Sequence, residues 1–203
     1  MEGFYIGLYK VLILIFSAVV HEYMHGWMAF RLGDNTAKDA GRLTANPLKH
    51  LEWFGSFLMP LVMILGNFPF VLGWAKPVPY NPSNLSDRRH GEAKVAAAGP
   101  LANLIIALAF GLALRWLPFH NLYFSSLIAA IVYINLVLMV FNLMPVPPLD
   151  GSKILATFLP DHLKVRYLSL ERMGFILVIL FVMLAGGIIL PIVNGLFRLI
   201  IGA

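Results

Sequence analysis

Residues 4–20 form an apolar run, interrupted only by Lys10, that leads directly into His21-Glu22-Tyr23-Met24-His25. A run of this length, continued through the motif, is long enough for a membrane-spanning helix. It has neither a basic n-region nor a small-residue cleavage site before it ends, so we expect it to be retained and not removed as a signal peptide. The sequence therefore predicts a first helix over residues 4–30 that carries three ionisable side chains to membrane depth.

The H-E-x-x-H spacing of these side chains is typical of a zinc site. His21 and His25 are one turn apart, so their imidazoles share one helix face and can bind one zinc ion, with Glu22 beside them as general base. The alternative is a chance match on a solvated surface stripe, but unpaired polar groups in a membrane have no water to satisfy them. Ionisable groups at this depth indicate function. We therefore predict one zinc ion per chain, held within the bilayer.

The composition indicates a polytopic membrane protein. The chain has 203 residues, of which 60% are hydrophobic and only 12% are charged, whereas soluble domains carry roughly 25% charged residues. We expect a single integral-membrane domain over residues 1–203 that is all-α and contacts the lipid bilayer. The net charge of +5 is explained by basic residues on one membrane face and does not predict a nucleic-acid partner. The chain has no cysteine, which excludes thiolate zinc ligands.

Three further apolar stretches have the length of a span. Together with the first helix they predict about four transmembrane helices, the later ones at residues 95–117, 124–144 and 174–190. The remaining residues 191–203 are an apolar tail for which crossing the bilayer and lying at its interface are both open. An apolar stretch at 54–72 is broken by Pro60, Gly66, Asn67 and Pro69.

A carboxylate follows the third of these spans. Asp150 stands in the sequence Asn142-Leu-Met-Pro-Val-Pro-Pro-Leu-Asp-Gly151, and a catalytic zinc needs three protein ligands and one open position. Taken alone, the segment also fits a proline-rich loop with an Asp-Gly turn. In combination with the first motif it predicts that Asp150 joins His21 and His25 on the metal.

This ligand set constrains the topology. If the two motifs share one side of the membrane, residues 31–94 must begin and end on that side, because the spans at 95–117 and 124–144 return the chain to it. Residues 54–72 are then predicted to be a re-entrant hairpin, with turn chemistry at 66–69. Near the active site, residues 41–48 and 71–80 have a strand-like pattern with prolines, which suits an edge to which an extended substrate could add.

The positive charges orient this topology. Twelve of the fifteen Lys and Arg residues fall on the motif side, and only Lys10, Arg115 and Arg198 lie elsewhere. The positive-inside rule makes the motif side cytoplasmic. We therefore expect a multi-pass protein of the cell membrane whose active site faces the cytoplasmic side.

The two motifs, in this order, resemble the site-2 protease family of intramembrane zinc metalloproteases. The resemblance extends to residues 41–50, 73–82 and 98–103, and is to the compact branch that lacks PDZ and nucleotide-sensing domains. It implies that His21, His25 and Asp150 are zinc ligands and that Glu22 is the catalytic base. It also implies that Asn142 holds the substrate carbonyl or its developing oxyanion. Residues 52–55, Glu-Trp-Phe-Gly, depart from the family's Asp-Pro-hydrophobic-Gly pattern.

These observations predict an intramembrane zinc metalloprotease that cleaves a transmembrane protein or peptide substrate in or near its membrane segment. The alternative is a non-catalytic zinc-binding membrane protein, a scaffold or a carrier. A carrier would spread ionisable residues along a route through several helices, and a scaffold would have no need of Glu22. Asn103 and Asn135 are expected to tie helices together, and His50 to be solvated. The substrate, the trigger and the oligomeric state stay open.

Overall fold

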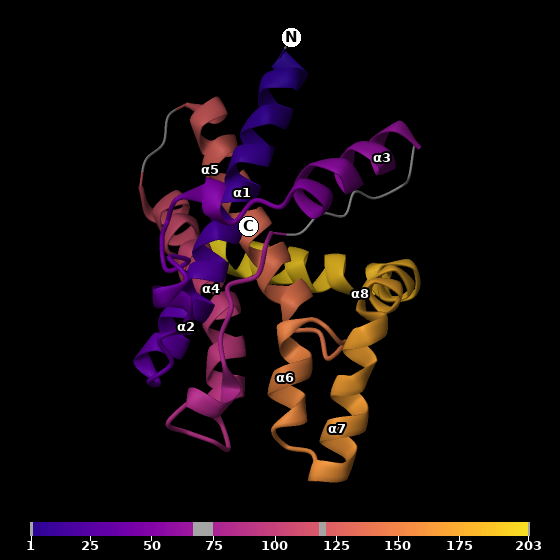
Figure 1. Ribbon diagram of the computed structural model, residues 1–203. Coiled ribbons are helices and arrows are strands. Elements are labelled where there is room, and N and C mark those ends of the chain that lie inside the picture. The colour runs from indigo at the N-terminus through magenta and orange to yellow at the C-terminus, as the bar shows by residue number, and fades with distance from the viewer. Residues whose placement is uncertain (1, 67–74, 118–120, 203) are drawn as a thin grey trace.

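The computed structural model describes residues 2–66, 75–117 and 121–202 of the chain (Figure 1). The regular secondary structure of this part is entirely helical, which confirms the all-α prediction. The helices are α1 Glu2–Arg31, α2 Thr36–Asp39, α3 Met59–Leu65, α4 Gly91–Trp116, α5 Leu122–Asn142, α6 Asp150–Ala156, α7 Asp161–Ser169 and α8 Gly174–Ile201. Short 3-10 helices lie at Pro47–Lys49, Pro82–Asn84 and Leu170–Met173, and a π-helical stretch at Trp53–Leu58 precedes α3.

Four helical stretches of the described chain are long and apolar enough to cross a membrane, at Gly7–Arg31, Gly91–Trp116, Leu122–Asn142 and Asp161–Leu184. This confirms the multi-pass prediction. The helix that follows residue 173 is longer than the predicted fourth span, because α8 begins at Gly174 and continues through Pro191 to Ile201. Proline removes one hydrogen bond and bends a helix without having to end it. The apolar tail is therefore the second half of α8.

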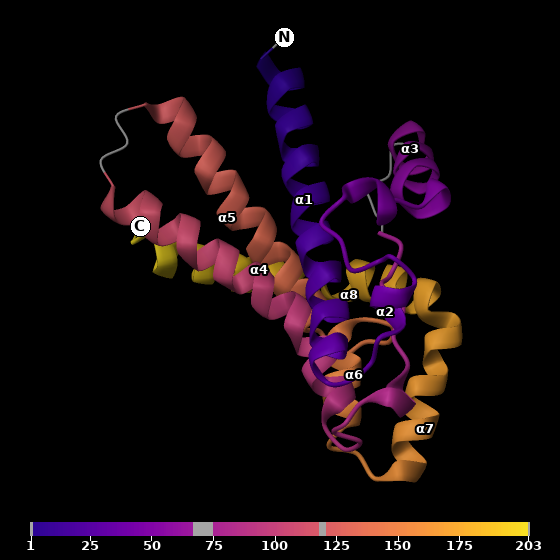
Figure 2. The same cartoon turned by 60° about the vertical axis from the view of Figure 1, so that its left-hand side comes forward.

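The core is the contact of α8 with α4 and α5. Ile189, Val193 and Ile200 of α8 are buried with Ala107 of α4 and with the α5 residues Val132, Leu136, Met139 and Val140. The C-terminal part of α1 packs on α4, next to the C-terminal end of α5 and to α6 (Figure 2). The two predicted metal-binding motifs, at the end of α1 and the start of α6, are thus brought to the same end of the bundle.

The stretches that flank the predicted re-entrant segment at 54–72 lie side by side. The backbone N–H of Lys76 donates a 2.7 Å hydrogen bond to the carbonyl of His50, and Ser86 N–H donates to Leu32 O at 2.8 Å. The chain that leaves after residue 50 has therefore returned to the same place at residue 76, as a re-entrant hairpin requires. Between them lies the short helix α3. The turn predicted at 66–69 falls outside the described residues except for Gly66.

The strand-like segments expected at 41–48 and 71–80 are not strands where the structure describes them. Residues 41–46 form turns and bends that lead into the 3-10 helix, and residues 75–80 follow an irregular path; residues 71–74 lie outside the described part. A ladder needs repeated backbone pairing, and the prolines at 77 and 79 have no N–H to supply it. Lys76 N–H donates one backbone hydrogen bond, to His50 O. The Arg42 guanidinium donates to the carbonyls of Lys76 and Pro77, so these carbonyls are not free to pair with a neighbouring strand.

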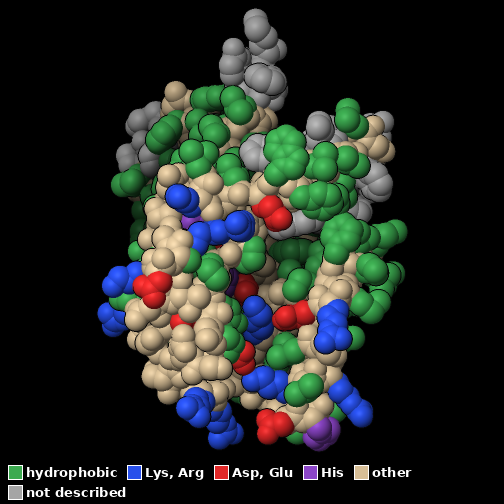
Figure 3. All heavy atoms as spheres, viewed as in Figure 1, with side chains coloured by type: hydrophobic (Ala, Val, Ile, Leu, Met, Phe, Trp, Pro, Cys, Tyr) green, Lys and Arg blue, Asp and Glu red, His purple; other side chains and the backbone are tan. Residues whose placement is uncertain are grey.

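Charged side chains gather at one end of the molecule. In the face shown in Figure 3, hydrophobic side chains cover the upper part, around α3 and α5, and Lys, Arg, Asp and Glu occupy the lower part, around α2, α6 and α7. The same view shows a hollow between these elements, with charged side chains on its walls. An apolar belt beside a charged end is the distribution that a bilayer-embedded protein requires.

Candidate metal centre

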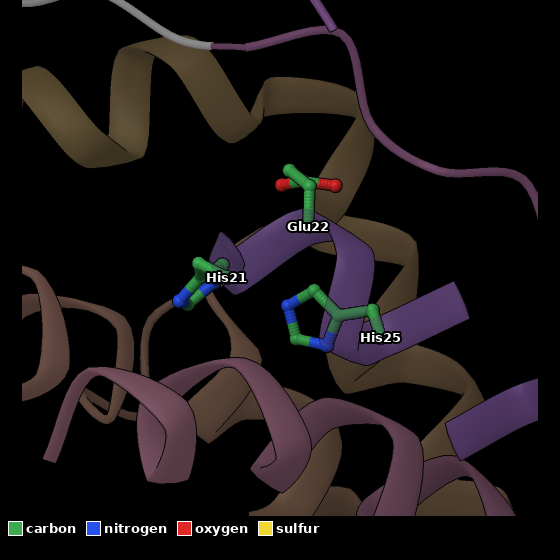
Figure 4. Close-up of side chains that lie close together, drawn as sticks. All are labelled: His21, Glu22 and His25. Atoms are coloured by element: carbon green, nitrogen blue, oxygen red, sulfur yellow. The ribbon is translucent and has the colours of Figure 1, made fainter. Parts of the chain in front are cut away.

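His21 and His25 lie one turn apart in α1 and are almost fully buried, with 6% and 9% of their surface exposed. Their rings meet edge to face, with centroids 4.6 Å apart. Figure 4 shows both imidazoles projecting from this turn of α1, whereas Glu22 leaves the helix on another side. The helical spacing predicted from the sequence therefore places the two rings together, as expected.

Asp150, the first residue of α6, completes this group. Its Oδ2 lies 3.1 Å from His21 Nε2 and 3.3 Å from His25 Nε2. Ligand atoms that surround one zinc tetrahedrally at about 2.0–2.1 Å are roughly 3.3 Å from each other. The carboxylate thus stands at the distance from both imidazoles that a shared zinc ion would set.

Glu22 offers a second carboxylate to the same two histidines, because ligand atoms of His21, Glu22 and His25 all lie within 4.8 Å of one another. Asp150 is closer to both rings, and one carboxylate oxygen of Glu22 already accepts a hydrogen bond from Val78. The geometry therefore favours Asp150 as the third ligand and leaves Glu22 beside the metal position.

The outer nitrogens of both rings face hydrogen-bond acceptors. His21 Nδ1 lies 2.6 Å from Asn103 Oδ1, and His25 Nδ1 lies 2.7 Å from the backbone carbonyl of Val95. Because these oxygens only accept, each Nδ1 carries a proton, which leaves each Nε2 as the nitrogen that can bind a metal ion. Both histidines are thus in the form in which imidazole binds a metal.

Gly99 of α4 forms one wall of the space between these ligands. A Cβ atom there would lie 2.6 Å from His25 Nε2 and 2.7 Å from His21 Nε2, far inside van der Waals contact. The missing side chain leaves room beside both Nε2 atoms. The donor set and this room together fit a zinc ion.

The Asp150 carboxyl group is ionised. Burial by itself raises its pKa, but the neighbouring imidazoles of His21 and then of His25 outweigh this effect and hold the pKa below its usual range. A carboxylate in this form is ready to bind a cation.

A segment that we name the strap, residues 75–81, passes over Glu22. The N–H of Val78 donates a 2.9 Å hydrogen bond to Glu22 Oε2. One turn further along α1, a Cβ at Gly26 would lie 2.7 Å from Val78 Cγ1, so this glycine lets the strap approach the helix closely. The strap therefore fixes one oxygen of the predicted general base.

Two charged residues hold the strap in place. Arg42 Nη2 donates to the carbonyls of Lys76 and Pro77, at 2.9 and 3.4 Å. Asp34, whose side chain is fully buried just after α1, accepts a 2.7 Å hydrogen bond from Asn81 N–H through Oδ2. Its Oδ1 accepts from Thr36 and from Asn84. The end of α1, which carries the histidines, is thereby tied directly to the strap.

Other predicted residues lie differently from expectation. The Asn142 side chain donates to the carbonyl of Leu138 in its own helix, at 2.9 Å, so its role toward a substrate stays a prediction. His50, expected to be solvated, is fully buried and bonds through Nε2 to Thr44 O. Asn103 and Asn135 do tie helices together, but Asn103 also contacts His21, which the sequence analysis missed.

Comparison with known proteins places these residues in a family. The family model described as "Peptidase family M50" matches residues 117–186. Over 197 residues the chain is 36% identical to a Bacillus subtilis protein named "Putative zinc metalloprotease YwhC", covering 92% of this chain and 86% of the relative. The chain belongs to peptidase family M50. The predicted resemblance to the site-2 protease family is thereby confirmed.

Two mycobacterial relatives of this M50 chain are each named "Putative zinc metalloprotease Rip2". The protein of Mycolicibacterium smegmatis is 32% identical over 180 residues, covering 86% of this chain and 67% of the relative. The protein of Mycobacterium tuberculosis H37Rv is 30% identical over 198 residues, covering 95% and 72%. No solved structure matches the chain.

Proposed function

We propose that this M50 protein hydrolyses peptide bonds in or near the transmembrane segments of other membrane proteins, acting as a zinc metalloprotease with one zinc ion per chain. His21, His25 and Asp150 hold the ion and Glu22 is the general base. The observation that carries the proposal is the meeting of Asp150 Oδ2 with both imidazole Nε2 atoms beside the Glu22 carboxylate. The family and the names of its relatives support the same chemistry.

The bound ion would act as a Lewis acid that polarises the scissile carbonyl. Glu22 takes a proton from the attacking water and passes it to the leaving amine. One of its oxygens is held by Val78 N–H, which leaves the other for proton transfer. Asn142 has two amide hydrogens, of which one is bonded to Leu138 O, and we propose that the other donates to the substrate carbonyl oxygen as it gains charge.

The expected addition of a substrate strand to the strap finds little support. The N–H groups of Lys76, Val78 and Asn81 already donate to His50, Glu22 and Asp34. The two carbonyls held by Arg42 are occupied as well. Contacts between the substrate and the strap would therefore be made by side chains.

We further propose that residues 1–203 act as one membrane-embedded unit of the cell membrane, with the active site toward the cytoplasm. Twelve of the fifteen Lys and Arg residues support this orientation, since they fall on the motif side of the predicted topology. The rival function, a non-catalytic zinc scaffold or carrier, gives no reason for a carboxylate held beside the ligands by a backbone N–H.

The experiment is cleavage of a panel of single-pass membrane proteins by purified protein, with the Glu22→Gln variant as control. Glutamine keeps an oxygen for Val78 N–H, so the strap contact is retained. We expect cleavage by the wild type alone and equal zinc content by elemental analysis. Cleavage by the variant would refute the mechanism, and loss of zinc from it would make Glu22 a ligand.

A further inference from the structure

We propose that Asn103 is a positioning residue for zinc binding, which holds the His21 ring in its metal-binding orientation through a buried chain of side chains that ends at Ser17. The inference rests on the proposed ligand role of His21. The chain runs from His21 to Asn103 on α4, then to Asn135 on α5, and back to Ser17 on α1.

Every member of this chain is buried and within hydrogen-bonding distance of the next. His21 Nδ1 and Asn103 Oδ1 are 2.6 Å apart, Asn103 Nδ2 and Asn135 Oδ1 are 2.9 Å apart, and Asn135 Nδ2 and Ser17 Oγ are 3.0 Å apart. Asn103 and Asn135 are fully buried, and Ser17 is 5% exposed. In such surroundings each polar group depends on its partner, because no water replaces a lost hydrogen bond.

The direction of the Asn103 amide is determined by its other contacts. Its nitrogen donates to Asn135 Oδ1 and lies 3.4 Å from the carbonyl of Ser17, and both of these oxygens are acceptors. The Asn135 nitrogen is in turn directed to Ser17 Oγ and to the carbonyl of Ile131. With the nitrogen ends fixed in this way, the Asn103 oxygen has to face His21.

The chemistry of an amide suits this place. A carboxylate would also accept from His21 Nδ1, but Glu22 and Asp150 already supply two negative charges at the site. Those two charges balance one Zn²⁺, and a third carboxylate would leave a net charge at membrane depth. An asparagine orients the imidazole without adding charge.

The second histidine lacks such a side-chain partner, because His25 Nδ1 faces the backbone carbonyl of Val95. Substitution of side chains cannot remove that acceptor. The two rings are therefore oriented by different means, and only the orientation of His21 is open to mutation.

The competing explanation is that both asparagines only tie helices together. Asn103→Leu and Asn135→Leu distinguish the two explanations. Each keeps four side-chain heavy atoms branched at Cγ and removes buried hydrogen bonds between helices, but only the first removes the partner of His21. We would measure the zinc dissociation constant of the purified full-length variants by competition with a chelator of known affinity. The thermal unfolding midpoint would be measured in excess chelator.

We expect Asn103→Leu to weaken zinc binding about 10–100-fold and Asn135→Leu to weaken it much less, while the metal-free midpoints fall together. Equal losses of zinc affinity in both variants, or none in Asn103→Leu, would overturn the proposal. Asn103→Asp, which keeps an acceptor for His21 but loses the donor to Asn135, should stay closer to the wild-type zinc affinity. It serves as the test if the leucine variant does not fold, and a loss as large as that of His21→Ala would then overturn the proposal.

The same assay distinguishes this inference from the proposed function. His21→Ala must lose zinc if His21 is a ligand. Retained zinc in that variant would refute the ligand assignment itself, whereas retained zinc in Asn103→Leu alone would refute only the positioning role.

Discussion

The backbone N–H of Val78 donates a hydrogen bond to Oε2 of Glu22, although the two residues are 56 positions apart in the sequence. The orientation of the proposed general base is thus set by a segment that follows the predicted re-entrant hairpin. Asp34 and Arg42 hold that segment in place. Substitutions that loosen the strap should therefore lower the rate of peptide cleavage and leave zinc binding unchanged.

Asp34→Ala should lower stability and turnover while zinc content is kept. The substitution removes the acceptor of Asn81 N–H and of the Thr36 and Asn84 donors, and each hydrogen bond to a charged group contributes about 1.5–3 kcal/mol. Zinc should stay because Asp34 is not among the proposed ligands. Unfolding, peptide cleavage and elemental analysis on the same sample check this. Asp161→Ala, at the start of α7, is the matched control and should behave as wild type.

Acid should weaken the hydrogen bonds that the Asp34 carboxylate accepts. Burial raises the pKa of Asp34, but the hydrogen bonds from Thr36, Asn81 and Asn84 outweigh it and lower the pKa below its ordinary value of 3.8. A carboxyl group whose pKa is lower in the folded protein stabilises it above the unfolded pKa, and this contribution is lost as the pH falls through the folded value. The difference in unfolding midpoint between wild type and Asp34→Asn should thus be constant above about pH 5 and shrink below about pH 4. A difference that grows toward acid would contradict the prediction.

Gly99→Ala should abolish zinc binding while all proposed ligands remain. The added methyl group would lie 2.6–2.7 Å from the Nε2 atoms of His25 and His21, in the space that the glycine leaves beside both atoms. Elemental analysis of the purified variant measures the loss. Gly187→Ala in α8 is the control, because a Cβ there meets nothing within 4 Å. Normal zinc content in Gly99→Ala would mean that the ion binds elsewhere.

Asn142→Ala should reduce the cleavage rate and leave zinc content and thermal stability nearly unchanged. Loss of one donor to a developing oxyanion typically costs about 10²–10³ in rate. The bond to Leu138 O lies within α5, so its removal should cost little stability. A variant that melts early, loses zinc or cleaves at the wild-type rate would show that the residue has a structural role.

Cysteines introduced at Lys49 and at Ser83 should both react with a membrane-impermeant thiol reagent from the cytoplasmic side. The hydrogen bond from Lys76 to His50 brings together the two stretches that flank the predicted re-entrant segment, and both Lys49 and Ser83 are exposed. The natural chain has no cysteine, so the background is clean. Labelling from opposite sides would refute the topology.

The sequence was sufficient to predict features that depend on spacing along a helix. The four-residue separation of His21 and His25 determines a shared face, and Asp150 was identified because few carboxylates lie at the ends of the predicted spans. The four spans followed from apolar length, except that α8 continues beyond Pro191 because packing on α4 and α5 stabilises its second half.

Features that depend on contacts between distant segments were missed. The position of Gly99 beside the proposed metal site is one such feature, because no local pattern tells which side chains face a glycine. His50 lies in a polar stretch and was expected to be solvated, but the returning chain buries it. The strand prediction was wrong for residues 41–48 and 75–80, and in the second stretch the Lys76 carbonyl and the Val78 N–H bond to the side chains of Arg42 and Glu22 and not to a neighbouring strand.

The hydrogen bonds that hold the strap in place all involve backbone atoms of the strap. Their partners are His50, Arg42, Glu22 and Asp34. The route of residues 75–81 thus depends mainly on their backbone, apart from Val78, which packs closely over Gly26, and Tyr80, which packs against the buried cluster of Ala29, Leu85 and Val95. The other side chains of the strap can therefore vary while the carboxylate beneath keeps its place, and we expect the substrates accepted to vary with them if, as proposed, substrates contact the strap through side chains. Related enzymes should differ most in substrate preference where their straps differ in sequence, and engineered specificity should begin at these positions.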